Sequence, residues 1–195
     1  MACLLYTSDA ADEEALDLLE QHKFDHFVAP GLAWLINTCF NASEWGLTPA
    51  VTKQMGYHDE LEHALESMKA LRRRGVRILP GGDYGFAWTP HGTNAKDLDY
   101  FVKHVGMSTM EALLSATAWG GPMMRMGKVL GYIREGYLAD ILLIDGDPLA
   151  DITVLQEKAR ILAVMKDGEF HRAPPLGTGR QVRTGAPATV NRWAA

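Results

Sequence analysis

The spacing of apolar side chains along the chain predicts several amphipathic helices. In residues 58–74 the apolar positions recur every three or four residues, which places them on one helical face, and Gly75 then ends the segment. Basic side chains fill the last turn, where they complement the helix dipole. Helices are also expected at three other places: residues 12–22, residues 96–105, and a segment opened by Ser108 with Glu111 as a capping box.

Strands are expected where the apolar period changes to two, or where short β-branched and aromatic runs lie between turn residues. Residues 33–52 are aromatic and irregular, so they are expected to form a long loop with a short helical turn. Residues 173–195 are rich in Pro, Gly, Ala and Arg and are expected to form a disordered tail. The expected strands are residues 24–30, 76–79, 139–144 and 159–165, the last followed by a hairpin at 166–168.

One of these strands ends in a carboxylate. The sequence VRILPGGDYGF, residues 76–86, is a β-branched run that breaks at two glycines and is followed at once by Asp83. In a parallel α/β barrel the carboxyl ends of the strands carry the catalytic groups, because the loops at that end converge on one pocket. An aspartate after two glycines is also a common turn former, since its side chain bonds nearby backbone amides. The surrounding pattern favours the catalytic interpretation.

Two segments together resemble the C-terminal part of the amidohydrolase superfamily. After VRILPGGDYGF comes LGYIREGYLADILLIDGDPLADI, residues 130–152, which is similar to the family's passage from its barrel into a small β-sandwich. The MKDG of residues 165–168 is similar to the hairpin that closes such chains. The resemblance covers residues 14–174 and is closest to the amide-hydrolysing, dipeptidase-like branch. The matching positions of the second segment are Gly131, Ile133, Gly136, Ala139 and Asp140, followed by the Asp-Gly-Asp-Pro turn at 145–148.

The resemblance implies a fold and a site. The fold is α/β: the last two strands and helices of a TIM-like (β/α)8 barrel, followed by the C-terminal part of a β-sandwich. Asp83 matches the aspartate that binds a divalent metal, one or two zinc ions, and shuttles the proton of hydrolysis. His91 and Trp88 lie in the next loop, where they are expected to contact a small amide or peptide-like substrate, although an exposed loop histidine and a packed aromatic are equally ordinary interpretations.

The family's other metal ligands cannot be placed in this chain. No two of its seven histidines are separated by one residue, so the His-x-His pair of the first barrel strand is missing. A whole barrel needs ~250 residues, whereas this chain has room for about two strand and helix pairs. Residues 3–13 resemble the translation of a transposase adapter used in sequencing libraries, which predicts an interrupted gene. The expected organisation is therefore a scar (1–13), part of the barrel (14–125), a β-sandwich segment (126–172) and the tail (173–195).

Composition narrows the function classes. With 47% hydrophobic and 22% charged residues and no long apolar run, the chain has the character of a globular protein without a membrane span. A net charge of −5 argues against nucleic acid as a partner. Cys3 and Cys39 are its only cysteines, which fits a reducing, cytoplasmic location, although a missing amino terminus leaves a secretory signal open.

Three functions compete at this point. The first is a fragment of a metal-dependent amidohydrolase that cleaves carbon–nitrogen bonds and is inactive by itself. The second is a cyclic-ring deaminase or phosphotriesterase-like member of the same superfamily. The third is a non-catalytic binding module. Self-association as a homo-oligomer is open in each case, because substrate choice and assembly depend on loops and surfaces that vary on a common barrel.

Overall fold

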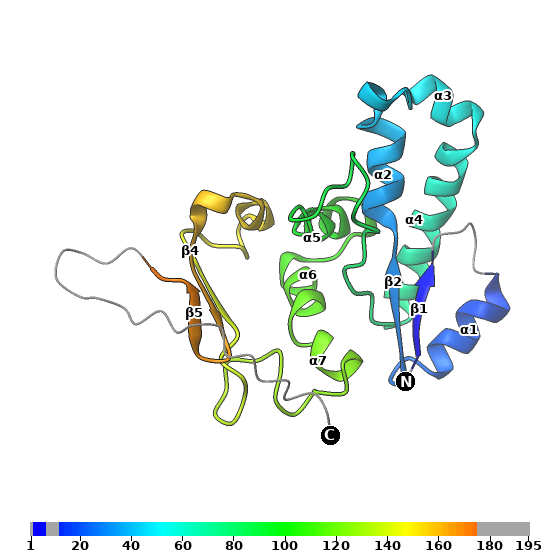
Figure 1. Ribbon diagram of the computed structural model, residues 1–195. Coiled ribbons are helices and arrows are strands. Elements are labelled where there is room, and N and C mark those ends of the chain that lie inside the picture. Colours follow the sequence, from blue (N-terminus) through cyan, green and yellow to red (C-terminus); the bar gives the residue numbers. More distant parts are fainter. Residues whose placement is uncertain (1, 7–11, 175–195) are drawn as a thin grey trace.

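The computed structural model describes residues 2–6 and 12–174. Helices fill most of the first two thirds, and an antiparallel sheet follows them (Figure 1). The elements are β1 Ala2–Tyr6, α1 Glu13–Gln21, β2 His26–Pro30, α2 Leu32–Phe40, η1 Ser43–Trp45, α3 Pro49–Gln54, α4 Tyr57–Arg73, α5 Lys96–Tyr100, η2 Phe101–Val105, α6 Thr109–Ala116, α7 Gly120–Met123, β3 Ile141–Ile144, η3 Ile152–Gln156, η4 Lys158–Arg160, β4 Ile161–Lys166 and β5 Glu169–Arg172.

Three backbone segments run parallel in the first part of the molecule. β2 pairs with β1 on one side, from Ala2 opposite His26 to Tyr6 opposite Pro30. On its other side the Val28 N–H donates to the Arg77 carbonyl at 3.0 Å, and the Val28 carbonyl accepts from Leu79 N–H at 2.8 Å. The strand expected at residues 76–79 is therefore a single parallel bridge, and Pro80 with the glycines after it ends the pairing. The backbone course of β1 does not test the proposed origin of residues 3–13.

β2 is buried on both faces, as a strand of a helix-covered parallel sheet should be. Its last four residues are buried, and α2 and α4 pack beside it (Figure 1). Met68 of α4 and Phe101 of η2 are fully buried in the same core. Cys39 lies there too, and burial raises the pKa of its thiol to about 11, so it remains a neutral core side chain. The amphipathic helix predicted over 58–74 is confirmed as α4.

The prediction of a long loop at residues 33–52 is wrong. α2, η1 and α3 occupy this stretch. α2 is buried almost all round, with seven buried residues out of nine, so its sequence has no polar face and no helical period. The start of α3 did carry a readable signal, because Thr48 is its N-cap and Pro49 stands in its first turn.

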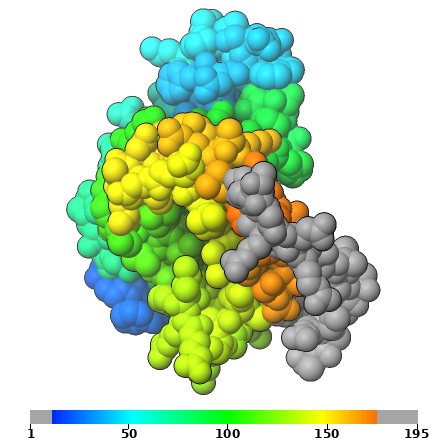
Figure 2. Space-filling model, turned by 90° about the vertical axis from the view of Figure 1, so that its left-hand side faces the viewer, coloured from blue at the N-terminus to red at the C-terminus, as the bar shows by residue number. Residues whose placement is uncertain are grey.

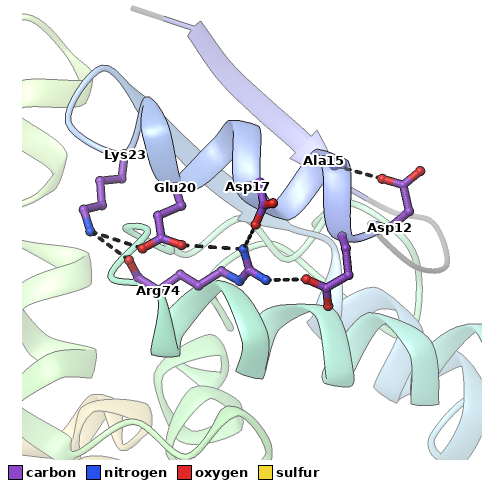
Figure 3. Close-up of polar contacts among 7 residues, drawn as sticks. Asp12, Ala15, Asp17, Glu20, Lys23 and Arg74 are labelled. Carbon is purple, nitrogen blue, oxygen red and sulfur yellow. Dashed lines mark hydrogen bonds and ion pairs between the residues drawn. The ribbon is translucent and has the colours of Figure 1, made fainter.

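An ion-pair cluster joins α1 to the end of α4 (Figure 3). The Arg74 guanidinium binds the carboxylates of Glu13 and Asp17, and Glu20 lies 3.5 Å away. Lys23 donates to the Arg74 carbonyl at 3.0 Å. The hydrogen bond to Asp17 raises the pKa of Arg74 most. Exposed pairs of this kind stabilise weakly, so the cluster chiefly sets how α1 meets α4.

The neighbouring arginine also has a structural partner. Arg72 binds the Glu111 carboxylate at 2.9 Å and ties α4 to α6. Glu111 closes the predicted capping box as well, since it accepts from Ser108 N–H at 2.8 Å, and this prediction is confirmed. Arg72 and Arg74 of the basic run thus join helices. Separately, none of the helices in the described chain is long and apolar enough to cross a membrane.

The last part is a three-stranded antiparallel sheet in the order β3-β4-β5. The yellow segment that contains η3 lies over part of the green helical segment in Figure 2, and Ile152 of η3 packs against Leu98 and Ala112. The Thr109 hydroxyl donates to the Leu149 carbonyl at 2.7 Å across this junction. The strands predicted at 139–144 and 159–165 and the hairpin after them are confirmed. The predicted domain boundaries remain predictions, and the predicted tail from residue 175 onward lies outside the described residues.

Candidate functional site

Asp83 stands on an exposed turn that follows the parallel segment 76–79. Its backbone is left-handed, with φ of 53°, and its side chain is exposed. Within the described chain no hydrogen bond or ion pair involves its carboxylate, while its carbonyl accepts from the Thr89 hydroxyl at 3.3 Å. A left-handed aspartate is uncommon and persists where its surroundings determine the backbone. The turn therefore presents a free carboxylate at the carboxyl end of a parallel segment.

Two glycines before Asp83 are needed because the backbone approaches its neighbours closely. A Cβ at Gly81 would lie 2.9 Å from the Ala29 Cβ. At Gly82 it would lie 2.6 Å from the Ala33 Cβ, closer than real side chains come. The glycines do more than break the strand, as the sequence suggested. They let the turn lie directly against β2 and α2.

A buried acid that the sequence did not reveal lies against this turn. Asp97 in the first turn of α5 is 1% exposed, and its Oδ2 accepts from Gly81 N–H at 3.0 Å. Burial raises its pKa to about 7, against the opposing effect of the Tyr84 hydroxyl and the glycine amides. Burial also raises the pKa of Tyr84, so the phenol stays protonated. In the sequence, the position of Asp97 next to the apolar Leu98 was the only sign that this acid is buried. The same position suits an ordinary exposed acid in the first turn of a helix.

Trp88 is held firmly in the loop after Asp83. Its indole N–H donates to the Thr38 hydroxyl of α2 at 2.9 Å. The loop turns sharply between Phe86 and Thr89, and Thr89 is fully buried. This arrangement fixes the Trp88 ring relative to α2 and to the turn that carries Asp83.

A row of aromatic rings continues from Trp88 in both directions. Trp88 lies 5.4 Å from Phe86 and 6.0 Å from Trp45 between ring centroids, and Trp34 then lies 5.8 Å from Phe86. Phe86 is 42% exposed and Trp45 is 47% exposed. We call Trp34, Phe86, Trp88 and Trp45 the aromatic row. The sequence singled out Trp88, whereas the row presents Phe86 and Trp45 more openly.

His91 follows in the same loop and is exposed. Its Nε2 lies 3.5 Å from where a Cβ at Gly85 would stand, so the imidazole is beside the chain two residues after Asp83. Asp83, Trp88 and His91 thus belong to one loop, residues 83–91. An apolar cavity of about 330 Å³ lies beside the segment that leads into the turn, and none of these three residues lines it. Its lining includes Leu79, Pro80, Leu98, Ser115 and Met123.

The described residues of this chain do not form a metal centre by themselves. Among residues 12–174 no group of three or more His, Cys, Asp or Glu side chains is arranged to hold an ion. Protein zinc sites take three or four such ligands, and Asp83 offers one carboxylate. A cofactor at this turn would need ligands from other residues.

The sequence and the fold of this chain match a known protein family. The model of the amidohydrolase family matches residues 4–170, and the chain belongs to that family. The ochratoxinase of Aspergillus niger is 33% identical over 115 residues, which are 58% of this chain and 23% of the relative. Its crystal structure superposes with a TM-score of 0.69 at 26% identity, covering 90% of this chain and 38% of that one.

Two further solved structures resemble the chain. A prolidase complexed with N-methylphosphonate-L-proline has 26% identity and a TM-score of 0.72, covering 88% of this chain and 40% of its own. A Xaa-Pro dipeptidase with methionine bound in its active site has 28% identity and a TM-score of 0.68, covering 83% and 38%. The chain therefore matches less than half the length of each relative. The α/β fold expected from the sequence, part of an amidohydrolase barrel with a following sheet, is confirmed.

Proposed function

We propose that this chain is the carboxyl-terminal part of an amidohydrolase that cleaves carbon–nitrogen bonds, and that Asp83 is a catalytic carboxylate. The observation that carries the proposal is the exposed, unpaired Asp83 at the carboxyl end of a parallel segment. That end of a barrel strand is where catalytic groups stand in this architecture. Asp83 accepts a proton from the attacking water and returns it to the leaving nitrogen, a role that a positioned carboxylate can perform.

A divalent metal, most simply zinc, is part of the proposal for the complete protein. Asp83 then contributes one ligand, and the remaining ligands come from barrel strands outside these 195 residues. The incomplete ligand set is the reason to propose that this chain alone is inactive. Half-exposed apolar side chains on the edge strand β3, Leu142 and Leu143, support the view that further chain packs here in the complete protein.

The proposed substrates are small amide or peptide-like molecules. The relatives named ochratoxinase, prolidase and Xaa-Pro dipeptidase support this class. We place the substrate beside the loop of residues 83–91, with the aromatic row against its apolar part and His91 toward a carbonyl or carboxylate. Flat aromatic surfaces suit apolar groups, and an imidazole N–H suits an acceptor oxygen.

The test compares this chain with a version in which the upstream barrel sequence of the source gene is restored. Both proteins are assayed with zinc, cobalt or manganese against dipeptides and N-acyl amino acids. We expect hydrolysis only by the restored protein. Turnover of cyclic amidines or phosphotriesters instead would favour the deaminase or esterase alternative. A restored protein that folds and binds metal but hydrolyses none of these would support the binding module.

The aromatic row gives a second prediction. Trp45→Ala in the restored enzyme should raise KM for amides with large apolar side chains by about tenfold, because burying such a group stabilises by about 1–3 kcal/mol, while kcat changes little. Phe24→Ala is the matched control, since Phe24 is 78% exposed and precedes the amino end of β2. Equal KM changes in both variants would contradict substrate contact with the row.

A further inference from the structure

The carboxylate of Asp97 contacts the turn before Asp83 rather than its own helix. Asp97 lies in α5, 16 residues after Gly81, and its Oδ2 accepts from the Gly81 N–H at 3.0 Å. Asp99, two positions on and also buried, bonds Lys103 at 2.7 Å within the same helical segment. Asp97 and Asp99 therefore make different contacts. Of these two acids, only Asp97 joins α5 to the glycine turn.

The turn is held from two sides at once. A Cβ at Gly82 would lie 2.7 Å from the Asp97 Oδ1 and 2.6 Å from the Ala33 Cβ. The Gly82 backbone thus fits between α5 and α2 with no room for a side chain. Asp83 comes directly after this gap, in the left-handed conformation that its surroundings must impose.

Burying the Asp97 carboxylate at this position costs free energy. Its Oδ1 is buried and accepts no well-formed hydrogen bond from a described residue, so the Tyr84 hydroxyl and the Gly82 amide only partly offset its loss of water. An apolar side chain would avoid that cost but could not accept from the Gly81 amide. A buried acceptor with an incompletely satisfied carboxylate calls for an explanation beyond packing.

We propose that Asp97 is a positioning residue that clamps the 81–82 turn between α5 and α2 and so fixes the direction of the Asp83 carboxylate. Asp97 acts through the Gly81 amide and does not touch the reacting atoms. The inference rests on the proposed function in one respect, that Asp83 is the working carboxylate. The clamp itself is a property of the fold and is measurable without any activity.

The first experiment measures amide hydrogen exchange at Gly81 in this chain. Asp97→Ala removes the acceptor, so Gly81 should exchange about tenfold faster relative to the wild type, the equivalent of one lost hydrogen bond. Asp97→Asn keeps a carbonyl acceptor and should restore most of the protection. Asp99→Asn is the matched control and should leave Gly81 unchanged. The Leu79 amide, which donates to the Val28 carbonyl, reports whether the sheet itself is intact.

The second experiment follows kcat and KM in the restored enzyme. Asp97→Ala should lower kcat by ~10–100-fold, as loss of a supporting shell does, with little change in KM, and Asp97→Asn should recover most of the loss. Asp99→Asn should keep wild-type kcat.

Unchanged Gly81 exchange in Asp97→Ala, or an equal change in Asp99→Asn, overturns the clamp. Faster Gly81 exchange with unchanged kcat overturns the positioning role. A wild-type restored enzyme without activity counts against the proposed function alone, because the exchange experiment still decides whether the clamp exists.

Discussion

Asp83→Asn in the restored enzyme is expected to lower kcat by at least ~10²–10⁴-fold, the contribution of general acid–base assistance, because an amide cannot accept the proton. The substitution should leave the fold nearly unchanged. The Asp83 side chain is exposed and unpaired in the described chain, and asparagine tolerates a φ of 53° as readily as aspartate does. Loss of activity would therefore report chemistry rather than unfolding.

Asp145→Asn is the matched control for this experiment. Asp145 is also an exposed aspartate, but it stands in the turn after β3, where its backbone N–H donates to the Arg160 carbonyl at 2.8 Å. Its amide variant should keep turnover per folded molecule. Steady-state kinetics, thermal melting and bound-metal content are measured for both variants. Near-normal kcat in Asp83→Asn would refute the assignment of Asp83 as the catalytic carboxylate.

Asp97→Asn is expected to make the chain more stable than the wild type at pH 8 and about equally stable at pH 4. Burial raises the Asp97 pKa above its unfolded value, from 3.8 to about 7. A raised acid pKa contributes stability that is fully present below the unfolded pKa and is lost as the pH rises through the folded pKa. At ~1.4 kcal/mol for each pKa unit, the loss approaches about 4 kcal/mol at pH 8, and asparagine avoids it.

Chemical denaturation of both proteins at intervals from pH 4 to pH 8 measures this difference. The value at pH 4 is an internal baseline, since the buried acid is then protonated and resembles the amide in shape and charge. The difference in unfolding free energy should grow between the unfolded pKa of 3.8 and the folded pKa of about 7, and should level off above it. A difference that stays flat across this range would mean that Asp97 is ionised at low cost in the folded chain.

Local chemistry explains why several elements could be read from the sequence. α4 repeats its apolar residues at helical spacing, and Gly75 ends it, so residues close in sequence determine it. The capping box of Ser108 and Glu111 is also complete within one turn. The helix α2 was not predicted from the sequence. It is buried on almost every side, so it lacks the polar face by which an amphipathic helix is recognised.

The sequence by itself determined the family motif, the place of Asp83 after a strand and the period-two strands of the C-terminal sheet. Only the tertiary structure decided which residues support that carboxylate. Asp97 meets Gly81 across 16 residues, and Trp88 meets Thr38 across 50, through contacts that no local pattern encodes. Backbone propensity acts over a few neighbours, whereas the direction of a functional side chain depends on close packing between distant elements.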